Sequence, residues 1–441
     1  MKWMIPMRLF DRKLALLLIV FCLPLMFLPK INIVKFHGET AGLRIDDFVL
    51  ALVCLIVFIA HYSLRKKLLD IEIWIGCIVI FSFISLAINQ ILVALEIISL
   101  DAKIYYCVRL LEYFLFFYVG LHLPLFCKLD RFVKAFFLWN LLIMILQKLD
   151  LIGGIVSQGY YSVSSRITGV ASFPSEMGAL LNLLFCVLVL SSQEKRKVKW
   201  NILPFFRQLF RSAAPYLLFL LFAVFTIFTG SRIAIIALLV TLLYKIHHEI
   251  SQRVPFSKSA AMFFLLICSF VLFHVIVNTA DVFQRSAHLF SLNNLVLIGD
   301  VWKNIDYVSK PFFQDAVKMG SYDMSWWIRI QKWCYALKVY VMHPECYLQG
   351  VGPGFTTAAL DGGFLRIFTE YGLVGCFLFW KLFAGIYKKS TLLQWMMIAF
   401  FFNMIFFDIY LAYKPMSVLF LVTGYTYAEY ACDNVCVNYQ A

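Results

Sequence analysis

Three arginines in separate stretches of the chain have side chains suited to binding one anionic headgroup. Arg166 lies in the polar segment SSRITGVASFPSE, Arg232 follows the break in TGSRIAIIALL, and Arg329 lies in SWWIRIQKWCYALKVY. A guanidinium group binds phosphate oxygens through charge-assisted hydrogen bonds that contribute about 1.5–3 kcal/mol each. The set therefore favours a phosphorylated ligand, above all a pyrophosphate. For each arginine alone, the alternative is a side chain that extends to lipid phosphates.

Two carboxylates and one histidine are candidates for a general base. Asp361 opens the segment DGGFLRIFTEYGLVG, Glu370 lies within it, and His343 precedes a proline. Each can take the proton from an attacking hydroxyl group. Non-catalytic alternatives stay open. Arg366 and Glu370 are four residues apart and could form an ion pair within a helix. Asp361 could cap a helix N-terminus, and His343 could be an ordinary turn residue.

The composition places these residues in a membrane protein. Of the 441 residues, 62% are hydrophobic and 15% are charged, which is too apolar for an ordinary water-soluble domain. Segments such as LALLLIVFCLPLMFL are apolar on every face, whereas the strands of a membrane barrel alternate apolar and polar residues. We therefore expect an all-α, polytopic transmembrane bundle that forms a single domain over residues 1–441.

The apolar windows predict about twelve spans, each near the length that crosses a bilayer. We place them at residues 14–29, 46–63, 71–88, 104–126, 132–149, 176–192, 214–229, 231–247, 261–277, 364–385, 391–411 and 415–430. Gly230, Ser231 and Arg232 separate the seventh span from the eighth, so these two form a tight hairpin or an interrupted helix pair.

The excess of basic residues follows the predicted topology. The net charge is +14, and most Lys and Arg fall in alternate connections, beginning with the segment before the first span. The positive-inside rule then puts both termini in the cytoplasm and gives no reason to expect a nucleic-acid partner. The N-terminal apolar run lacks a small-residue cleavage site, so we interpret it as a retained signal anchor.

The longest segment between spans covers residues 278–363, which this topology places on the outer side as a large loop. It is rich in Trp and Tyr, whose rings can stack on sugars or anchor a loop at the membrane interface. Its pattern over residues 325–340 predicts an amphipathic helix on the membrane surface, with Arg329, Lys332 and Lys338 on the polar face.

The cysteines give no sign of a metal site. The twelve cysteines are scattered, and Cys432 and Cys436 form an isolated pair without nearby histidines. Cys334 and Cys346 could form a disulfide if the outer compartment is oxidising. GVGPG at 350–354 lacks the ending of a nucleotide-binding loop and predicts a flexible turn. We expect neither a metal nor a cofactor.

Several of these segments resemble a known family. Arg329-x3-Trp333, HPECYLQGVGPGF and DGGFLRIFTEYGLVG together resemble the signature region of bacterial O-antigen polymerases and the related O-antigen ligases. RITGVASFPSEMGALL and TGSRIAIIALL are also similar to segments of that family. The resemblance is confined to these blocks; elsewhere it extends to hydropathy and to one large loop late in the chain.

The resemblance implies a metal-independent, inverting glycosyltransferase of the bacterial cytoplasmic membrane. It would act at the outer face on polyprenyl-pyrophosphate-linked oligosaccharides, with Arg166, Arg232 and Arg329 as the phosphate ligands. The ligase pattern has a His, a small polar residue, nine residues and then Gly-x2-Gly. Gly372 and Gly375 fit, but Asp361 stands in the place of the His. We therefore prefer a polymerase with Asp361 as the base and His343 as a substitute.

Other functions remain open at this point. The alternatives are a ligase that transfers glycan to a lipid A core, a polysaccharide flippase or transporter, and a nonenzymatic scaffold of an assembly complex. Transporters of this size usually have two related halves, which this chain lacks. The expected partners of a polymerase are membrane lipid, a chain-length regulator and a flippase.

Overall fold

The structure, a computed structural model, is built almost entirely of helices in the residues that it describes. It describes residues 5–28, 34–35, 42–43, 45–65, 67–97, 102–152, 166–190, 218–251, 292–308, 324–356 and 359–437. The longer helices are α1 (Ile5–Phe27), α2 (Ile45–Arg65), α3 (Asp70–Ala94), α4 (Ile104–His122), α5 (Leu129–Lys148), α7 (Pro174–Phe185), α10 (Arg232–Ser251), α13 (Leu292–Asn304), α14 (Met324–Met342), α15 (Gly363–Tyr387), α16 (Thr391–Met404) and α17 (Tyr413–Val437).

Shorter elements connect or extend these helices. Three are 3-10 turns: η1 (Leu123–Leu125), η5 (Pro344–Cys346) and η6 (Ile409–Leu411). One is a π-helical extension of α7, η2 (Cys186–Leu190), and a further helix covers Leu218–Thr229. β1 (Val34–Lys35) and β2 (Gly42–Leu43) form a short antiparallel pair.

Among the described residues, three helices are long and apolar enough to cross a membrane: Asp70–Ala94, Ile104–Leu125 and Gly363–Tyr387. A helix of 25 residues is about 37 Å long, more than the roughly 30 Å of a hydrocarbon core. Shorter apolar helices pack around them. The described residues are therefore consistent with a helical membrane protein, whereas twelve spans and an outer loop at 278–363 stay predictions.

The predicted apolar spans fall on helices wherever the structure describes them, with one correction. The predicted span 261–277 lies outside the described residues. The predicted span 391–411 is wrong in length, because α16 ends at Met404 and the chain turns through η6 before α17 begins at Tyr413. Asp408 lies in this turn and bonds to another helix, which explains why the chain leaves the helical path there.

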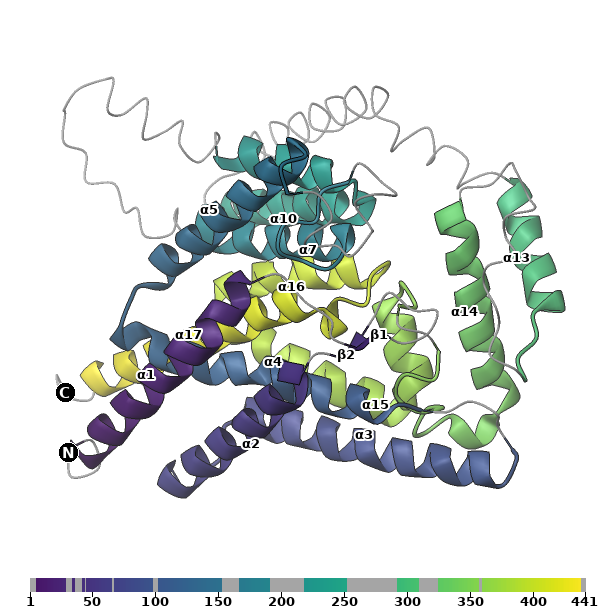
Figure 1. The fold of residues 1–441 in the computed structure, drawn as a ribbon, viewed down its shortest axis with the longest axis horizontal. Coiled ribbons are helices and arrows are strands. Elements are labelled where there is room, and N and C mark those ends of the chain that lie inside the picture. The colour runs from purple at the N-terminus through teal and green to yellow at the C-terminus, as the bar shows by residue number, and fades with distance from the viewer. Residues whose placement is uncertain are drawn as a thin grey trace.

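The core is centred on α4, and α17 packs closely along it (Figure 1). A Cβ at Gly120 would meet the carbonyl oxygen of Leu421, and one at Gly424 would meet that of Phe117. Glycines at these points let the two backbones approach each other, as in many membrane helix pairs. α4 is thus the helix against which other elements are positioned.

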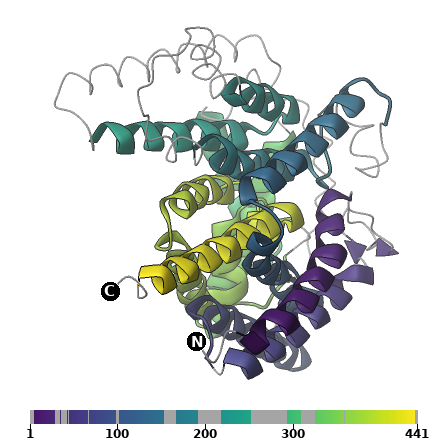
Figure 2. The same cartoon turned by 90° about the vertical axis from the view of Figure 1, so that its left-hand side faces the viewer.

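The two ends of the bundle differ in what they carry. α13 and α14 lie side by side at one edge, next to α15, while the start of α1 and the end of α17 lie at the opposite edge (Figure 1). The start of α1 and the end of α17 face the viewer in Figure 2. The polar α14 region is therefore separated from the ends of α1 and α17 by the length of the bundle.

α15 is broken at Gly372, which has a φ of +62°. The turn after α14 occupies the break. The amides of Val351 and Gly352 donate to the carbonyl oxygens of Thr369 and Glu370 at 2.9 and 3.1 Å. The amides of Leu373 and Val374 donate to the carbonyls of the turn residues 347 and 348. These four backbone groups of α15 have partners in the turn, as an apolar environment requires.

The GVGPG segment at 350–354 belongs to the turn that fills the break in α15, and it packs against α15 and the ring of Tyr106. The carbonyl of Val351 accepts from Asn89 of α3 at 2.6 Å, and that of Pro353 accepts from the amide of Lys103 at 2.8 Å. The turn at 350–354 is therefore present, but it is held between three helices.

Gly354 is expected to tolerate no side chain. Its φ is +76°, and an added Cβ would lie 2.1 Å from the Tyr106 ring. Gly354→Ala should lower the melting temperature of the purified protein markedly, because backbone strain and overpacking each cost about 1–3 kcal/mol. Gly76→Ala is the matched control: it lies within α3 with nothing near its Cβ position, so it should be neutral or slightly stabilising. Equal melting temperatures for the two variants would contradict this.

Candidate functional site

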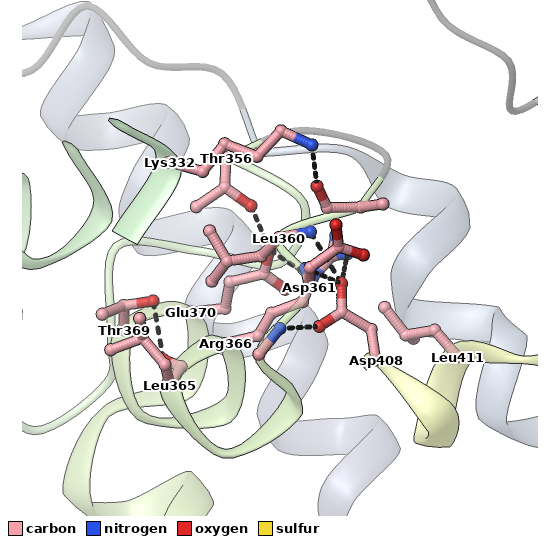
Figure 3. Close-up of polar contacts among 12 residues, drawn as sticks. Lys332, Thr356, Leu360, Asp361, Leu365, Arg366, Thr369, Glu370, Asp408 and Leu411 are labelled. Atoms are coloured by element: carbon pink, nitrogen blue, oxygen red, sulfur yellow. Dashed lines mark hydrogen bonds and ion pairs between the residues drawn. The ribbon is translucent and has the colours of Figure 1, made fainter. Parts of the chain in front are cut away.

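Several ionisable residues lie close together where α14, η6 and the start of α15 meet (Figure 3). Arg366, Glu370 and Asp408 form a buried ion cluster, with at most 6% of any of the three side chains exposed. Arg329 and Asp361 form a rim pair beside it, with 25% and 29% of their side chains exposed. The site thus has a sealed part and an accessible part.

Arg366 holds the ion cluster together. Its Nε lies 2.9 Å from Glu370 Oε1, and its Nη1 lies 2.9 Å from Asp408 Oδ2. The guanidinium also lies over the ring of Tyr106, 4.9 Å from its centroid. Arg109 lies over the same ring at 5.3 Å and donates to the carbonyl of Leu411. Two guanidinium groups on one tyrosine ring connect α4 to α15 and η6.

Asp408 shapes the backbone at the start of α15. Its Oδ2 accepts from the amides of Leu360 and Asp361 at 2.7 and 3.3 Å, and its Oδ1 accepts from Gly362 at 3.0 Å. A carboxylate at a helix N-terminus is favoured by both the free amides and the helix dipole. Asp408 therefore caps α15 from another part of the chain.

The prediction that Asp361 caps α15 is wrong. The N-cap residue of α15 is Gly362, which has no side chain that could accept a hydrogen bond from the first amides of the helix. Asp361 has a φ of +58°, a left-handed conformation that is uncommon for residues other than glycine. This turn directs three successive amides to Asp408 and leaves the Asp361 carboxylate free to face α14.

Three contacts fix α14 to the segment before α15. Arg329 Nε lies 3.4 Å from Asp361 Oδ2, and Lys332 Nζ donates to the carbonyl of Ala359 at 2.5 Å. Trp333 Nε1 donates to the carbonyl of Leu360 at 3.1 Å. The predicted amphipathic helix is present, but these polar side chains, like Lys338, which caps the end of α13, turn toward the protein.

The burial and the partners of Glu370 indicate a structural role. Its side chain is fully buried, and Oε1 accepts from Arg366 and from the Thr356 hydroxyl group at 3.1 Å. The intrahelical ion pair, which the spacing left open, is formed. A carboxylate without exposed surface is poorly placed to meet a substrate hydroxyl group, so Asp361 is the better candidate for a base.

His343 lies away from the rim pair. It follows the last residue of α14, and its Nδ1 lies 2.8 Å from Glu345 Oε1. It lies fourteen positions after Arg329, which corresponds to a distance of about 21 Å along the helix. The structure does not bring His343 to the candidate site.

Arg166 and Arg232 lie at the junction between the Leu218–Thr229 helix and α10. Arg166 donates to the carbonyls of Thr229 and Gly230 at 3.0 and 2.9 Å, at the end of the Leu218–Thr229 helix. Arg232 begins α10 two residues later, so the predicted break at Gly230 is confirmed. A cation at helix C-terminal carbonyls is favourable on its own. The described contacts thus join Arg166 to the residues just before Arg232, whereas they join Arg329 to Asp361.

Other sequence-based expectations concern cysteines and metals. Cys334 and Cys346 are both free and buried, so the disulfide is not formed. Within the described ranges, no three His, Cys, Asp or Glu side chains are grouped closely enough to hold a metal ion. These observations leave the ion cluster and the rim pair as the chemical features of this region.

The sequence analysis missed Asp408, although a signal for it existed. Asp408 is an acidic residue inside the predicted span 391–411, and an ionisable residue within an apolar span is a candidate for function. Tyr106 and Lys332 had no such signal, because their roles depend on which helices meet.

The chain matches no protein-family model and no curated protein.

Arg366→Gln should be among the most destabilising substitutions in the chain. It leaves the buried carboxylates of Glu370 and Asp408 without their cation, and breaking a buried ion pair costs about 3–5 kcal/mol. The melting temperature of the purified protein measures this. Lys134→Gln is the control, because it removes an ion pair of the same i,i+4 spacing that is about half exposed on each side, so its cost should be below about 1 kcal/mol.

Because of Lys332, the stability of the protein should change with pH in the alkaline range. Burial lowers the pKa of Lys332 below its ordinary value, and the carboxylates of Asp361 and Asp408 offset this only in part. Between the lowered pKa and the ordinary one, the unfolded chain binds more protons than the folded chain, so Lys332 makes stability rise with pH. Lys332→Met should therefore reduce the change of the melting temperature with pH just below the ordinary lysine pKa of about 10.4. Lys303 is exposed, so Lys303→Met should leave the slope of melting temperature against pH as in the original protein. Equal slopes for the original protein and both variants would contradict the prediction.

Proposed function

We propose that this protein is a surface-polysaccharide polymerase of the O-antigen type. It would transfer a polyprenyl-pyrophosphate-linked glycan onto another lipid-linked repeat unit, without a metal ion and with inversion at the anomeric carbon. The family resemblance in the segments around Arg329 and Asp361 supports the reaction class. The observation that carries the proposal is the rim pair, an acid and a guanidinium group that are both accessible and both held by a rigid support.

The rim pair has the two functions that such a transfer needs. Asp361 takes the proton of the acceptor hydroxyl group as its oxygen attacks the anomeric carbon. The bond from that carbon to the phosphate oxygen breaks on the opposite face, and the electron pair leaves with the diphosphate. Arg329 neutralises the charge that develops there. Pyrophosphate is already a good leaving group, so proton removal and charge stabilisation are the remaining tasks.

The support of Asp361 favours this role over a purely structural one. Its left-handed backbone is an uncommon conformation, held by Asp408 and the ion cluster. Strained backbone persists only where surrounding structure over-determines it, and it is concentrated at functional sites. The Arg329 to Asp361 distance of 3.4 Å is long for a charge-assisted bond, so a substrate can separate the two groups at small cost.

Arg232 and Arg166 take part in the proposal as a second phosphate-binding region. Arg232 stands at the first turn of α10, where helix amides and dipole favour an anion. Arg166 ties this turn to the preceding helix. The diphosphate of the growing chain and that of the incoming unit are two anionic groups, which gives two separate basic locations a use.

The proposed setting is the bacterial cytoplasmic membrane, with several spans and both termini in the cytoplasm. The rim pair lies near α13 and α14, away from the start of α1 and the end of α17, which agrees with a site facing the periplasm or cell exterior. A flippase that delivers the lipid-linked unit and a chain-length regulator are the partners that such a reaction implies.

Asp361→Asn and Arg329→Ala should strongly slow polymer formation in proteoliposomes supplied with lipid-linked repeat units. Loss of a general base lowers the rate about 100- to 10,000-fold. Loss of one phosphate-binding guanidinium group lowers it roughly 10- to 100-fold. Product ladders on a gel measure both. The matched controls are Asp130→Asn and Lys134→Ala, which disrupt an exposed ion pair on α5 and should leave the ladder unchanged.

The same assay separates the competing functions. Full ladders from both variants, with normal insertion, would refute the enzyme proposal and favour a scaffold. Glycan attached to a lipid A core acceptor instead of a lipid-linked repeat would identify a ligase. Movement of lipid-linked units across the bilayer without new bonds would identify a flippase.

A further inference from the structure

The end of α14 and the turn after it expose large apolar side chains at one tip of the molecule. The apolar tip consists of Val341, Met342, Tyr347 and Leu348, and Leu348 has 63% of its surface exposed. The hydroxyl group of Tyr347 donates to the carbonyl of Val341 at 3.1 Å, which brings the two parts of the tip together. A contiguous apolar patch of this kind marks a surface that contacts something other than water.

The apolar tip is continuous with the exposed side of α15. The amide of Leu373 donates to the carbonyl of Tyr347 at 3.0 Å, and that of Val374 donates to the carbonyl of Leu348 at 3.1 Å. Leu373 and Val374 are themselves exposed on α15, as is Phe377 one turn further on. These residues belong to a helix that is long and apolar enough to cross a membrane.

The position of α15 sets the depth of the apolar tip. Val374 is the twelfth of the 25 residues of α15, so it lies near the middle of the helix. Although α15 is broken at Gly372, the break lies near the middle of a segment that is apolar enough to cross the hydrocarbon core of roughly 30 Å, so a crossing would keep Val374 within that core. Because backbone hydrogen bonds join Leu348 to Val374, the tip cannot move away from α15 without breaking them.

The polar groups beside the apolar tip have partners. His343 pairs with Glu345 at 2.8 Å, and Gln349 Nε2 donates to the carbonyl of Glu345 at 2.7 Å. The hydroxyl group of Ser85 on α3 donates to the carbonyl of Gln349 at 2.8 Å. Such pairing lowers the cost of placing this turn beside lipid.

We propose that the apolar tip inserts into the membrane leaflet on the side of α13 and α14, and that its partner is phospholipid. This contact goes beyond the proposed reaction and does not depend on it. It holds one end of α14 in lipid while the rim pair and Lys332 hold the other end on the protein. The lipid surface thereby sets the direction of the helix that carries Arg329.

Site-directed photocrosslinking in phosphatidylcholine liposomes tests the insertion. Benzoylphenylalanine is placed at position 342 or 348 of the full chain, and the lipid carries an alkyne for detection after irradiation. Position 377 on the exposed side of α15 is the positive control, and the exposed position 304 at the end of α13 is the matched control. Lipid adducts at 342 and 348 should match those at 377, and position 304 should give none above background.

Every other pattern overturns the insertion. Adducts at 377 alone would place the apolar tip in water. Adducts between two copies of the chain at 348 would show that protein covers it. Adducts of equal strength at 304 would show that the apolar tip contacts lipid no more than an exposed polar position does. No adducts at 377 would show that the exposed side of α15 does not contact lipid, and the argument for the tip would fail with it. Each readout is independent of glycan transfer, so failure here leaves the proposed polymerase standing, and the reverse also holds.

Discussion

The arrangement at the start of α15 depends on one buried guanidinium group shared between two carboxylates. Arg366, Glu370 and Asp408 lie in the interior, where an unpaired charge costs several kcal/mol and each member needs the others. Glu370 belongs to the same helix, but Asp408 comes from the turn between α16 and α17. The ion cluster therefore decides where that turn lies, and with it the backbone of residues 360–362.

A second constraint comes from the break in α15. At Gly372 the helix leaves backbone groups without helical partners, and the turn after α14 supplies them. The groups need partners wherever water is scarce. As a result α14, which ends at Met342, is joined to α15 or to the residues just before it at two places: at the rim pair and, through the turn that follows α14, at the break. The helix with the candidate phosphate ligand and the segment with the candidate base are thus held together at two places.

The described contacts of two of the arginines lie on different segments. Arg166 donates to carbonyls just before Arg232, at the junction that precedes α10, while Arg329 faces Asp361. His343 and Glu370, which have suitable chemistry, are excluded from the rim by distance along α14 and by burial.

The sequence by itself determined the helical class and the positions of most apolar helices, because hydropathy over some 20 residues is a local property. It also predicted the break at Gly230 and the amphipathic segment 325–340, and it offered the pairing of Arg366 with Glu370 as one alternative, since each depends on neighbours within one turn. Only the tertiary structure decided that Asp408 caps α15, that Asp361 turns toward Arg329, and that α16 stops at Met404. Those facts depend on residues tens of positions apart, and a buried charge takes its partner from whichever segment the packing brings near it.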